Sequence, residues 1–565
     1  MLEQNKNLSF KQWFKSGEAY IWLNASAVTI SVVAVVGLLL LLAVRGFGHF
    51  WPSDIIEAEY QLPNEASYKV IGEVVESEFV PKQQLLDAGF KIDSEEAFIE
   101  RSLIKQGNRD VTGLDFSWVL NDYLTNIRKP EQLMSVERYE WGHFYGYLRG
   151  VKELGQLQAI ETDELLWANF QQRIGRAVAL HEDIKSIEKG AIGSINYAIE
   201  RLRLRERGLD LNKNLSSSER ARELAVINEE RAELDAEYSI LQKQLMALYE
   251  QVNRDSFLAE TMSGKQVEIP ISHVVHALRP NALSVFEKFQ VYLTKFWEFL
   301  TDEPREANTE GGIFPAIFGT IMMVLLMSVM VTPFGVVAAV YLREYAKQGP
   351  LTRTVRIAVN NLAGVPSIVY GVFGLGFFIY FVGAELDKVF FETALPAPTF
   401  GTPGLLWASL TLALLTLPVV IVSTEEGLSR IPRALREGSL ALGATKAETL
   451  WRVVLPMASP AMMTGLILAV ARAAGEVAPL MLVGVVKLAP SLPVDGNYPY
   501  LHLDQKFMHL GFHIFDVGFQ SPNVEAARPL VYATALLLVI IIAMLNLSAV
   551  ALRNHLRERY KSLEM

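Results

Sequence analysis

The sequence predicts an all-α polytopic membrane protein with six transmembrane helices and an α+β domain inserted between the first two helices. Six apolar runs are each long enough to cross a bilayer. A polar stretch at residues 45–307 separates the first run from the other five, and it is too long for an unstructured loop. Basic residues gather in alternate connections, which orients the runs in the membrane.

The first apolar run, residues 25–44, predicts an uncleaved membrane anchor. It follows residues 1–24, which carry Lys6, Lys11 and Lys15. The run exceeds the apolar core of a typical signal peptide, and no small-residue cleavage site follows it. The other predicted spans are residues 313–341, 362–382, 405–423, 461–486 and 529–552.

The charges of the connections predict that both termini face the cytoplasm. The connection at residues 342–357 is basic, with Arg343, Lys347, Arg353 and Arg356 against Glu344. The connection at residues 383–402 is acidic, with Glu385, Asp387 and Glu392 against Lys388. Basic connections stay in the cytoplasm. The domain at residues 45–307 is therefore expected in the periplasm.

Composition and charge exclude several classes of function. The chain has 565 residues, 51% of them hydrophobic, and no cysteine, so disulfides, thiol catalysis and thiolate metal sites are excluded. Residues 51–310 hold 30 basic and 45 acidic side chains, for a net charge of −15, whereas the rest of the chain holds 22 and 17, for +5. An acidic domain beside a basic membrane part argues against nucleic-acid binding.

The polar region predicts a mixed domain with a long helical hairpin. Strands are expected at residues 67–79, 97–104 and 266–271, and helices at residues 118–179 and 282–300. Apolar residues recur at three- and four-residue steps on both sides of a turn within residues 184–252, where Ser216 and Glu219 match a capping box. This pattern is typical of an antiparallel coiled-coil hairpin. The alternative is an apolar stripe that packs on the rest of the domain.

Residues 437–456 contain the most specific motif of the chain. Glu437 precedes Gly443, Val453 follows after nine further residues, and Leu455-Pro456 completes the spacing. This spacing resembles the EAA loop of ABC-importer permeases, with Gly438 and Ser439 in place of the two alanines and Val453 in place of isoleucine. The resemblance implies a coupling helix that docks in a separate cytoplasmic ATPase. An ordinary amphipathic loop is the alternative.

Two local features of this loop complete the prediction. Glu448 and Arg452 have the i, i+4 spacing of an ion pair, and Pro456 is expected to stop the helix where the next apolar run begins. The sequence of residues 438–445 is close to the pattern of a phosphate-binding P-loop, but Ala444 occupies the place of the essential lysine. The chain is therefore predicted not to hydrolyse nucleotide and not to be an enzyme.

Other stretches resemble one branch of these permeases, the phosphate-transport permeases called PstA. They are Asn308-Thr-Glu-Gly-Gly-Ile-Phe-Pro315, Pro333-Phe-Gly335, Tyr341-Leu-Arg-Glu-Tyr-Ala346, Asn361-Leu-Ala-Gly-Val-Pro-Ser-Ile-Val-Tyr-Gly371 and Arg472-Ala-Ala-Gly-Glu476. The resemblance implies a permease domain at residues 308–565 in the bacterial inner membrane. It also implies a high-affinity phosphate importer with a sister permease, two ATPase subunits and a periplasmic phosphate-binding protein. The role of the external domain is not implied.

Arg472 and Glu476 are the predicted substrate-pathway residues. Arg472 lies near the middle of the apolar run at residues 461–486, and Glu476 follows one helical turn later. A charge at that depth costs about 2.5–3.5 kcal/mol, so both should face the bundle or a water path. A guanidinium can bind phosphate oxygens in pairs. The alternative is a structural ion pair that ties two helices. Val477 stands where members of the PstA branch have threonine, so this chain lacks the hydroxyl group that threonine would offer there.

No metal site or cofactor is predicted. His509 and His513 have the i, i+4 spacing of metal ligands, with His502 nearby, but no Glu-x-x-His pattern accompanies them. Membrane lipid is expected around the spans. Three other functions remain open at this stage. They are a membrane-anchored periplasmic adaptor, a secondary transporter driven by ions, and a permease for another oxyanion.

Overall fold

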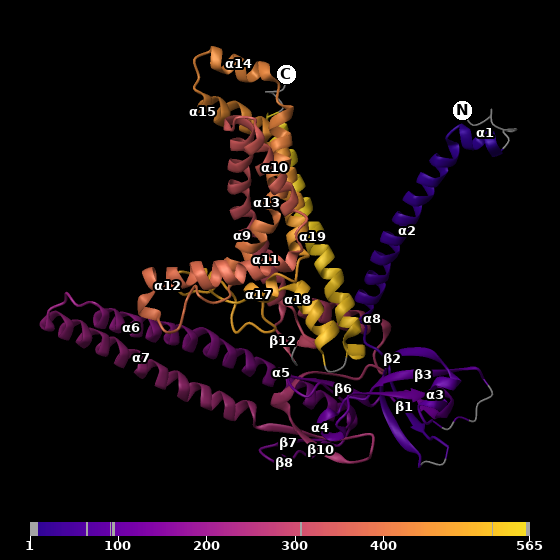
Figure 1. The fold of residues 1–565 in the computed structure, drawn as a ribbon. Coiled ribbons are helices and arrows are strands. Elements are labelled where there is room, and N and C mark those ends of the chain that lie inside the picture. Colours follow the sequence, from indigo (N-terminus) through magenta and orange to yellow (C-terminus); the bar gives the residue numbers. More distant parts are fainter. Residues whose placement is uncertain are drawn as a thin grey trace.

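The computed structural model describes residues 10–63, 66–90, 92, 96–305, 308–521 and 524–560, so the predicted boundary at residue 307 lies outside the described residues. Figure 1 shows a bundle of long apolar helices, a domain of β-sheets at one end of the bundle, and a long helical hairpin that projects from the sheets. The first long helix diverges from the others over much of its length.

Among the described residues, six helical segments are long and apolar enough to cross a membrane, in agreement with the six predicted spans. They are α2 (Glu18–Gly48), α9 (Phe314–Val340) with η5 (Tyr341–Tyr345), α11 (Ser367–Phe373) with η6 (Gly374–Gly383) and α12 (Ala384–Phe390), α13 (Leu405–Arg430), α15 (Lys446–Thr449) with η8 (Leu450–Val454) and α16 (Leu455–Ala474), and α19 (Val524–Tyr560). The short helix α1 (Phe10–Lys15) precedes α2. Of the six, α13 is the most buried and forms the centre of the bundle.

Glycines let α9 and α16 approach α13 closely. A Cβ at Gly335 of α9 would lie 2.5 Å from Val420 Cγ1, and a Cβ at Gly465 of α16 would lie 2.7 Å from Ser423 Cβ. Neither distance is possible without a shift of the neighbouring helix. Small residues at helix contacts are typical of membrane bundles. Gly335, from the stretch Pro333-Phe-Gly335, therefore has a packing role.

The third predicted span has different bounds from the ones expected. The chain first runs along the bundle as α10 (Pro350–Leu362), and the segment α11–α12 then crosses the direction of α9 and α13 (Figure 1). Pro366 is the residue before α11 and ends the preceding turn. The predicted span at residues 362–382 corresponds to the apolar helical segment Ser367–Phe390, which begins and ends later than expected because Pro366 separates it from α10.

The fifth predicted span, residues 461–486, is also wrong in its bounds. The apolar helix starts earlier, at Lys446, and α16 ends at Ala474. Gly475 follows the helix, and Pro479 precedes the short helix α17 (Leu480–Val483). Hydropathy alone did not register this break. Arg472 consequently lies in the last turn of α16, not near the middle of a span.

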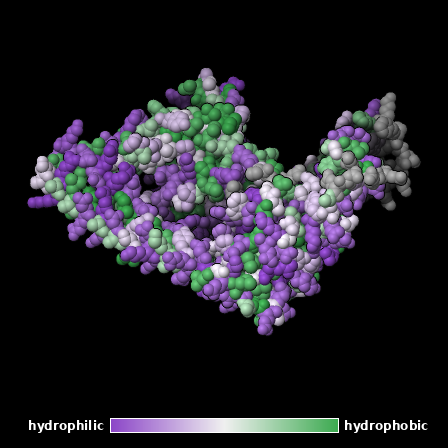
Figure 2. All heavy atoms as spheres, turned by 90° about the horizontal axis from the view of Figure 1, so that it is seen from below, coloured by the Kyte–Doolittle hydropathy of each residue, from purple (hydrophilic) through white to green (hydrophobic). Residues whose placement is uncertain are grey.

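The domain beside the bundle contains two antiparallel sheets. The first has the order β4-β3-β2-β1-β5, and the second the order β10-β9-β7-β6-β11, with β8 paired to β7. The strands are β1 (Ile55–Tyr60), β2 (Tyr68–Pro81), β3 (Phe98–Lys105), β4 (Phe116–Leu120), β5 (Leu124–Arg128), β6 (Leu133–Arg138), β7 (His143–Glu153), β8 (Gln156–Leu157), β9 (Asp255–Glu260), β10 (Gln266–Pro270) and β11 (Val274–Leu278). A separate pair, β12 (Pro304–Arg305) and β13 (Glu310–Gly311), precedes α9. Seen from below, hydrophilic residues cover most of this end of the molecule (Figure 2).

The strands predicted at residues 67–79, 97–104 and 266–271 are confirmed by β2, β3 and β10. The helix predicted at residues 118–179 is wrong over its first two thirds, where β4 to β8 lie. In β6 almost every side chain is buried, so the alternation that marks a half-exposed strand is lost. The helix at residues 282–300 is confirmed as α8 (Val285–Thr301), which begins with a capping box at Ser284 and Glu287.

The predicted hairpin is present as two antiparallel helices. The first is built of α5 (Asp163–Lys185), η2 (Ser186–Ile192) and α6 (Gly193–Leu211), and the second is α7 (Ser217–Val252). The predicted capping box at Ser216 and Glu219 is confirmed. Ion pairs of 2.5 Å between Arg205 and Glu223, and of 2.7 Å between Arg231 and Glu206, join α6 to α7. The coiled-coil seam itself stays a prediction.

Candidate functional site

The loop at residues 437–456 forms a helix–turn–helix at the end of the bundle away from the sheets (Figure 1). Glu437 is exposed on α14 (Arg433–Ala441). Gly443 has φ +88°, a left-handed conformation that strains any residue with a Cβ. Thr445 then caps α15 by accepting a hydrogen bond from the backbone N–H of Glu448. The glycine predicted from spacing is therefore required by the turn.

The side chains around this loop hold it to the bundle. The Arg436 guanidinium lies 3.0 Å from the Glu344 carboxylate, in the stretch that resembles the PstA branch. Lys446 lies over the ring of Tyr345, 4.5 Å from its centre, and donates to the Glu344 carbonyl oxygen. Leu450 and Val454 are buried in one cluster with Leu428 at the end of α13. The loop therefore moves with α9 and α13.

The turn also presents apolar side chains to the outside. Leu442 is 91% exposed, Trp451 is 74% exposed, and Leu440 is 47% exposed. Large apolar groups in such positions are typical of a protein contact. Leu442 and Trp451 were not singled out from the sequence. The signal that could have found them is their position, since Leu442 directly precedes Gly443 and Trp451 directly follows Leu450.

Two details of the loop differ from the prediction. The Glu448 carboxylate accepts hydrogen bonds from the backbone and hydroxyl of Thr445, both at 2.8 Å, so it caps α15 instead of bridging to Arg452. Pro456 does not stop a helix, because Leu455 and Pro456 open α16 directly after η8.

Arg472 and Glu476 lie at the opposite end of α16 from the loop at residues 437–456. With 1.5 Å of rise per residue, Leu455 and Arg472 are roughly 25 Å apart along the helix. The Arg472 Nε and the Glu476 Oε1 are 3.8 Å apart, and the side chains are 33% and 22% exposed. This separation exceeds hydrogen-bonding distance. The pair is therefore an open contact, and the guanidinium retains N–H groups for another anion.

The stretch at residues 361–371 lies against the chain that follows Arg472. A Cβ at Gly371 would lie 2.7 Å from the Pro479 Cα, so only glycine fits there. The Tyr370 hydroxyl donates to the Leu362 carbonyl oxygen at 2.6 Å. The fold thus brings two stretches that resemble the PstA branch to one place, although they are far apart in sequence.

The three histidines His502, His509 and His513, which precede α19, are buried within the fold. His509 and His513 are buried beside α18 (Leu510–Phe515), and burial lowers the pKa of each to about 4. His509 Nδ1 accepts from the Gly511 backbone at 3.1 Å. His502 Nε2 lies 2.8 Å from the Asp495 carboxylate. No group of three His, Asp or Glu side chains that could hold a metal occurs within the described residues.

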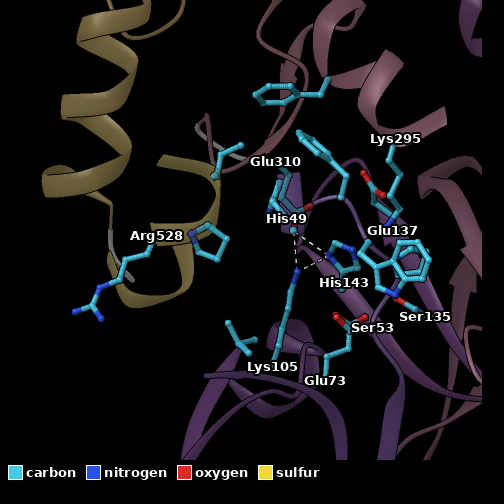
Figure 3. Close-up of a pocket in the computed structure, with 18 of the residues that line it drawn as sticks. His49, Ser53, Glu73, Lys105, Ser135, Glu137, His143, Lys295, Glu310 and Arg528 are labelled. Atoms are coloured by element: carbon cyan, nitrogen blue, oxygen red, sulfur yellow. Dashed lines mark hydrogen bonds and ion pairs between the residues drawn. The ribbon is translucent and has the colours of Figure 1, made fainter. Parts of the chain in front are cut away.

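The stretch at residues 308–315 fastens the bundle to the sheet domain. The Asn308 amide donates to the Lys487 carbonyl oxygen at 2.9 Å, in the chain that precedes α19. The Glu310 carboxylate lies 3.0 Å from His143 Nδ1 and 3.7 Å from Lys105 Nζ, both in the sheets. These groups line a cavity of about 540 Å³ at the lower end of α2 (Figure 3). Glu310 therefore joins the two parts of the molecule through charge.

The environment of Glu310 shifts its ionisation. Burial alone would raise the pKa of this carboxyl, but its hydrogen bond to His143 and the positive charges of Lys105 and Arg305 outweigh burial and hold the pKa far below its usual 4.5. A carboxyl with a depressed pKa stabilises the folded state above its usual pKa, and this contribution is lost as the pH falls through the folded-state pKa. The junction is therefore expected to weaken in acid.

Replacing Glu310 by glutamine (E310Q) is expected to destabilise the sheet domain by about 1–3 kcal/mol at neutral pH, because a buried charge partner is lost. Thermal unfolding of the purified chain in detergent measures this. The difference between E310Q and the unsubstituted protein should shrink as the pH falls below about 4.5, because the carboxyl of the unfolded chain then takes up a proton while the folded-state carboxyl, with its lowered pKa, stays charged. The exposed residue Glu131 provides the control, E131Q, which should be neutral. Equal melting of E310Q and E131Q would contradict the assignment.

The C-terminal part of the chain is similar to known proteins. Residues 331–562 match the family described as binding-protein-dependent transport system inner membrane component. A phosphate transport system permease protein PstA of Mycobacterium leprae is 36% identical over 245 residues, which cover 43% of this chain and 71% of that protein. A probable PstA of Methanocaldococcus jannaschii is 27% identical over 49% of this chain and 85% of that protein. A solved inward-facing MetNI methionine ABC transporter is 20% identical over 43% of this chain and 94% of its own, with a TM-score of 0.32.

The fold and the projecting loop define a multi-pass membrane permease, a class that forms a transport pathway and is not an enzyme. The chain belongs to the binding-protein-dependent transport system inner membrane component family of ABC-importer permeases, and its C-terminal half is of the PstA type. This membership favours a permease over the adaptor and the secondary transporter that the sequence alone left open. The sheet domain and the hairpin lie outside the matched residues.

Proposed function

We propose that this chain is one of two permease subunits of an ABC importer that carries inorganic phosphate into the cell. The observation that carries the proposal is the combination of the PstA-type stretches with Arg472, a partly exposed guanidinium at the end of α16. A sister permease forms the other half of the pathway. The PstC protein of Mesorhizobium japonicum, which is 32% identical over 34% of this chain, illustrates how similar two such subunits are.

In this proposal the loop at residues 437–456 couples the permease to two ATPase subunits. Glu437 offers a carboxylate to a basic group of the ATPase, and the exposed Leu442 and Trp451 supply the apolar contact. Gly443 provides the turn, and Leu455-Pro456 connects it to α16. Because Arg436 and Lys446 bind the loop to η5, a displacement of the loop reaches the bundle.

At the other end, Arg472 admits the phosphate anion received from a periplasmic binding protein. Guanidinium matches phosphate oxygens in paired hydrogen bonds. Glu476 holds Arg472 when the path is empty, and its negative charge keeps phosphate binding weak enough for release. The competing role, a purely structural ion pair, is distinguished by the substitution argued in the Discussion.

The hairpin lies along the external loops of the permease in this arrangement. The Tyr197 hydroxyl of α6 donates to the Tyr498 carbonyl oxygen, and a Cβ at Gly208 would lie 3.6 Å from the Thr393 side chain. Figure 1 shows α6 beside α12 and the loops around it. The hairpin is therefore placed to contact a binding protein as it docks on the permease.

The topology that follows has both termini in the cytoplasm and residues 45–307 in the periplasm, with the chain in the inner membrane. A single cysteine at Asn214 (N214C), in the exposed hairpin turn of this cysteine-free chain, tests it. We expect an impermeant thiol reagent to label N214C in intact spheroplasts. A cysteine at Gly438 in the coupling loop (G438C) should react only after lysis. The reverse pattern would overturn the topology.

A further inference from the structure

The polar side of helix α8 faces the protein, whereas part of its apolar side is exposed. Its polar residues point toward the sheet domain: Lys288 pairs with Asp54, and Glu298 lies 2.8 Å from His276. Lys295 lines the cavity at the lower end of α2 (Figure 3). The polar arc of the helix is therefore used within the protein.

One part of the apolar arc packs on the ends of the spans. Phe299 and Phe296 lie 5.0 and 5.4 Å, between ring centres, from Phe50, which follows α2. The same cluster contains Ile313 at the start of α9 and Leu530 near the start of α19. α8 is thus fixed at the level where three apolar helices end on the side of the sheet domain.

The rest of the apolar arc faces outward and is uncovered by the described residues. It consists of five large side chains, with exposed fractions from 48% for Phe289 to 76% for Val285: Val285, Phe286, Phe289, Leu293 and Trp297. At 100° per residue these five positions fall within one third of the helix circumference. Isolated exposed apolar residues are ordinary, but a continuous stripe marks a surface that is covered in use.

This stripe continues the exposed apolar surface of α2. The ring centres of Phe47 and Phe296 are 6.2 Å apart, and those of Trp51 and Tyr292 are also 6.2 Å apart. Phe47 and Trp51 are themselves partly exposed. The 18-residue apolar window of α2 has none of its residues buried within the chain. These ring contacts therefore join the exposed apolar surface of α2 to α8.

We propose that the outer face of α8 lies in the interfacial layer of the bilayer leaflet that adjoins the sheet domain. A helix with aromatic and aliphatic residues on one face and charges on the other binds this layer with its apolar face at the acyl boundary. Tryptophan and tyrosine favour the same depth. The inference rests on the membrane assignment of the family and does not depend on phosphate as the substrate.

Contact between α8 and lipid gives the sheet domain a fixed height above the membrane. α8 is joined to the sheets through Lys288 and Glu298 and to the bundle through Phe299. The hairpin is connected to the same sheets, since α5 follows β8 and α7 precedes β9. The height of the sheet domain above the membrane therefore sets the position of the hairpin over the external loops. The helix acts as a lipid-bound support for the domain.

Fluorescence quenching on the complete transporter tests this proposal. The chain has no cysteine, so single cysteines at Phe286 and Trp297 (F286C, W297C) can each carry a bimane label. Thr294, exposed on the polar arc, provides the matched control T294C. Each labelled complex is reconstituted in vesicles of phosphatidylethanolamine and phosphatidylglycerol, with or without phosphatidylcholine that bears a doxyl quencher near its headgroup.

We expect the doxyl lipid to quench bimane at positions 286 and 297 strongly, and aqueous iodide to quench it little. Position 294 should show the opposite preference. Strong iodide quenching at 286 and 297 would show that the stripe faces water. Protection from both quenchers would show that a protein, such as the sister permease, covers it. Either result overturns the proposal, and neither bears on phosphate transport.

Discussion

An R472Q variant is expected to lose phosphate uptake while it still inserts and assembles with the ATPase. Glutamine is polar but lacks the charge and the paired donors of guanidinium. Each charge-assisted hydrogen bond that disappears costs about 1.5–3 kcal/mol. At 1.4 kcal/mol per tenfold change, two lost bonds reduce affinity by roughly a hundredfold or more. Uptake of radiolabelled phosphate by cells that depend on this importer measures the loss, and co-purification of the ATPase reports assembly.

The chain offers a matched control for this substitution. Arg430 pairs with Glu426 at i, i+4 with the same 3.8 Å separation, but at the end of α13 next to the coupling loop and fully on the surface. An R430Q variant should transport normally. It would show that losing an i, i+4 ion pair does not by itself stop transport, so that the effect of R472Q comes from the position of Arg472. Failure of R472Q to assemble would support a structural ion pair. Uptake at the normal rate would exclude both roles of Arg472.

The second large effect is expected from a G443D substitution in the coupling loop. The left-handed φ of +88° disfavours every residue with a Cβ. The cost of the left-handed conformation is about 1–2 kcal/mol. Aspartate adds a negative charge beside the exposed Leu442 and Trp451, where the ATPase is proposed to dock. We predict that G443D reaches the membrane in normal amount but loses its ATPase subunits on purification.

A G438D variant is the control for charge without backbone strain. Gly438 lies within α14 with helical geometry, and a Cβ there would meet no atom within 4 Å. It should retain more ATPase than G443D. Full transport by G443D would rule out the coupling role of this turn.

Much of the bundle was predictable because hydropathy and charge act locally. The six apolar runs, the position of Gly443 and the capping box at Ser216 each depend on a few neighbouring residues. The prediction failed where the environment decides the outcome. β6 is buried on both faces, so its residues lost the alternation that identifies a strand.

The candidate site shows the same division. Arg472 and Glu476 were identified from a motif, but the helix was expected to continue beyond them, because a hydropathy window does not register the break at Gly475 and Pro479. The close approach of Gly371 to Pro479 was not foreseen, because it depends on the packing of α11 beside the start of α17. Glu310 likewise became notable only when His143 and Lys105 were found beside it.

The most direct test of the account is the ATPase activity of the complex reconstituted from this chain, its sister permease, the ATPase and the phosphate-binding protein. We predict that phosphate-loaded binding protein stimulates ATP hydrolysis, that the phosphate-free protein stimulates it little, and that G443D abolishes the response. Equal hydrolysis with sulfate-loaded and phosphate-loaded binding proteins would contradict phosphate as the substrate. Hydrolysis that ignores the binding protein altogether would contradict the importer itself.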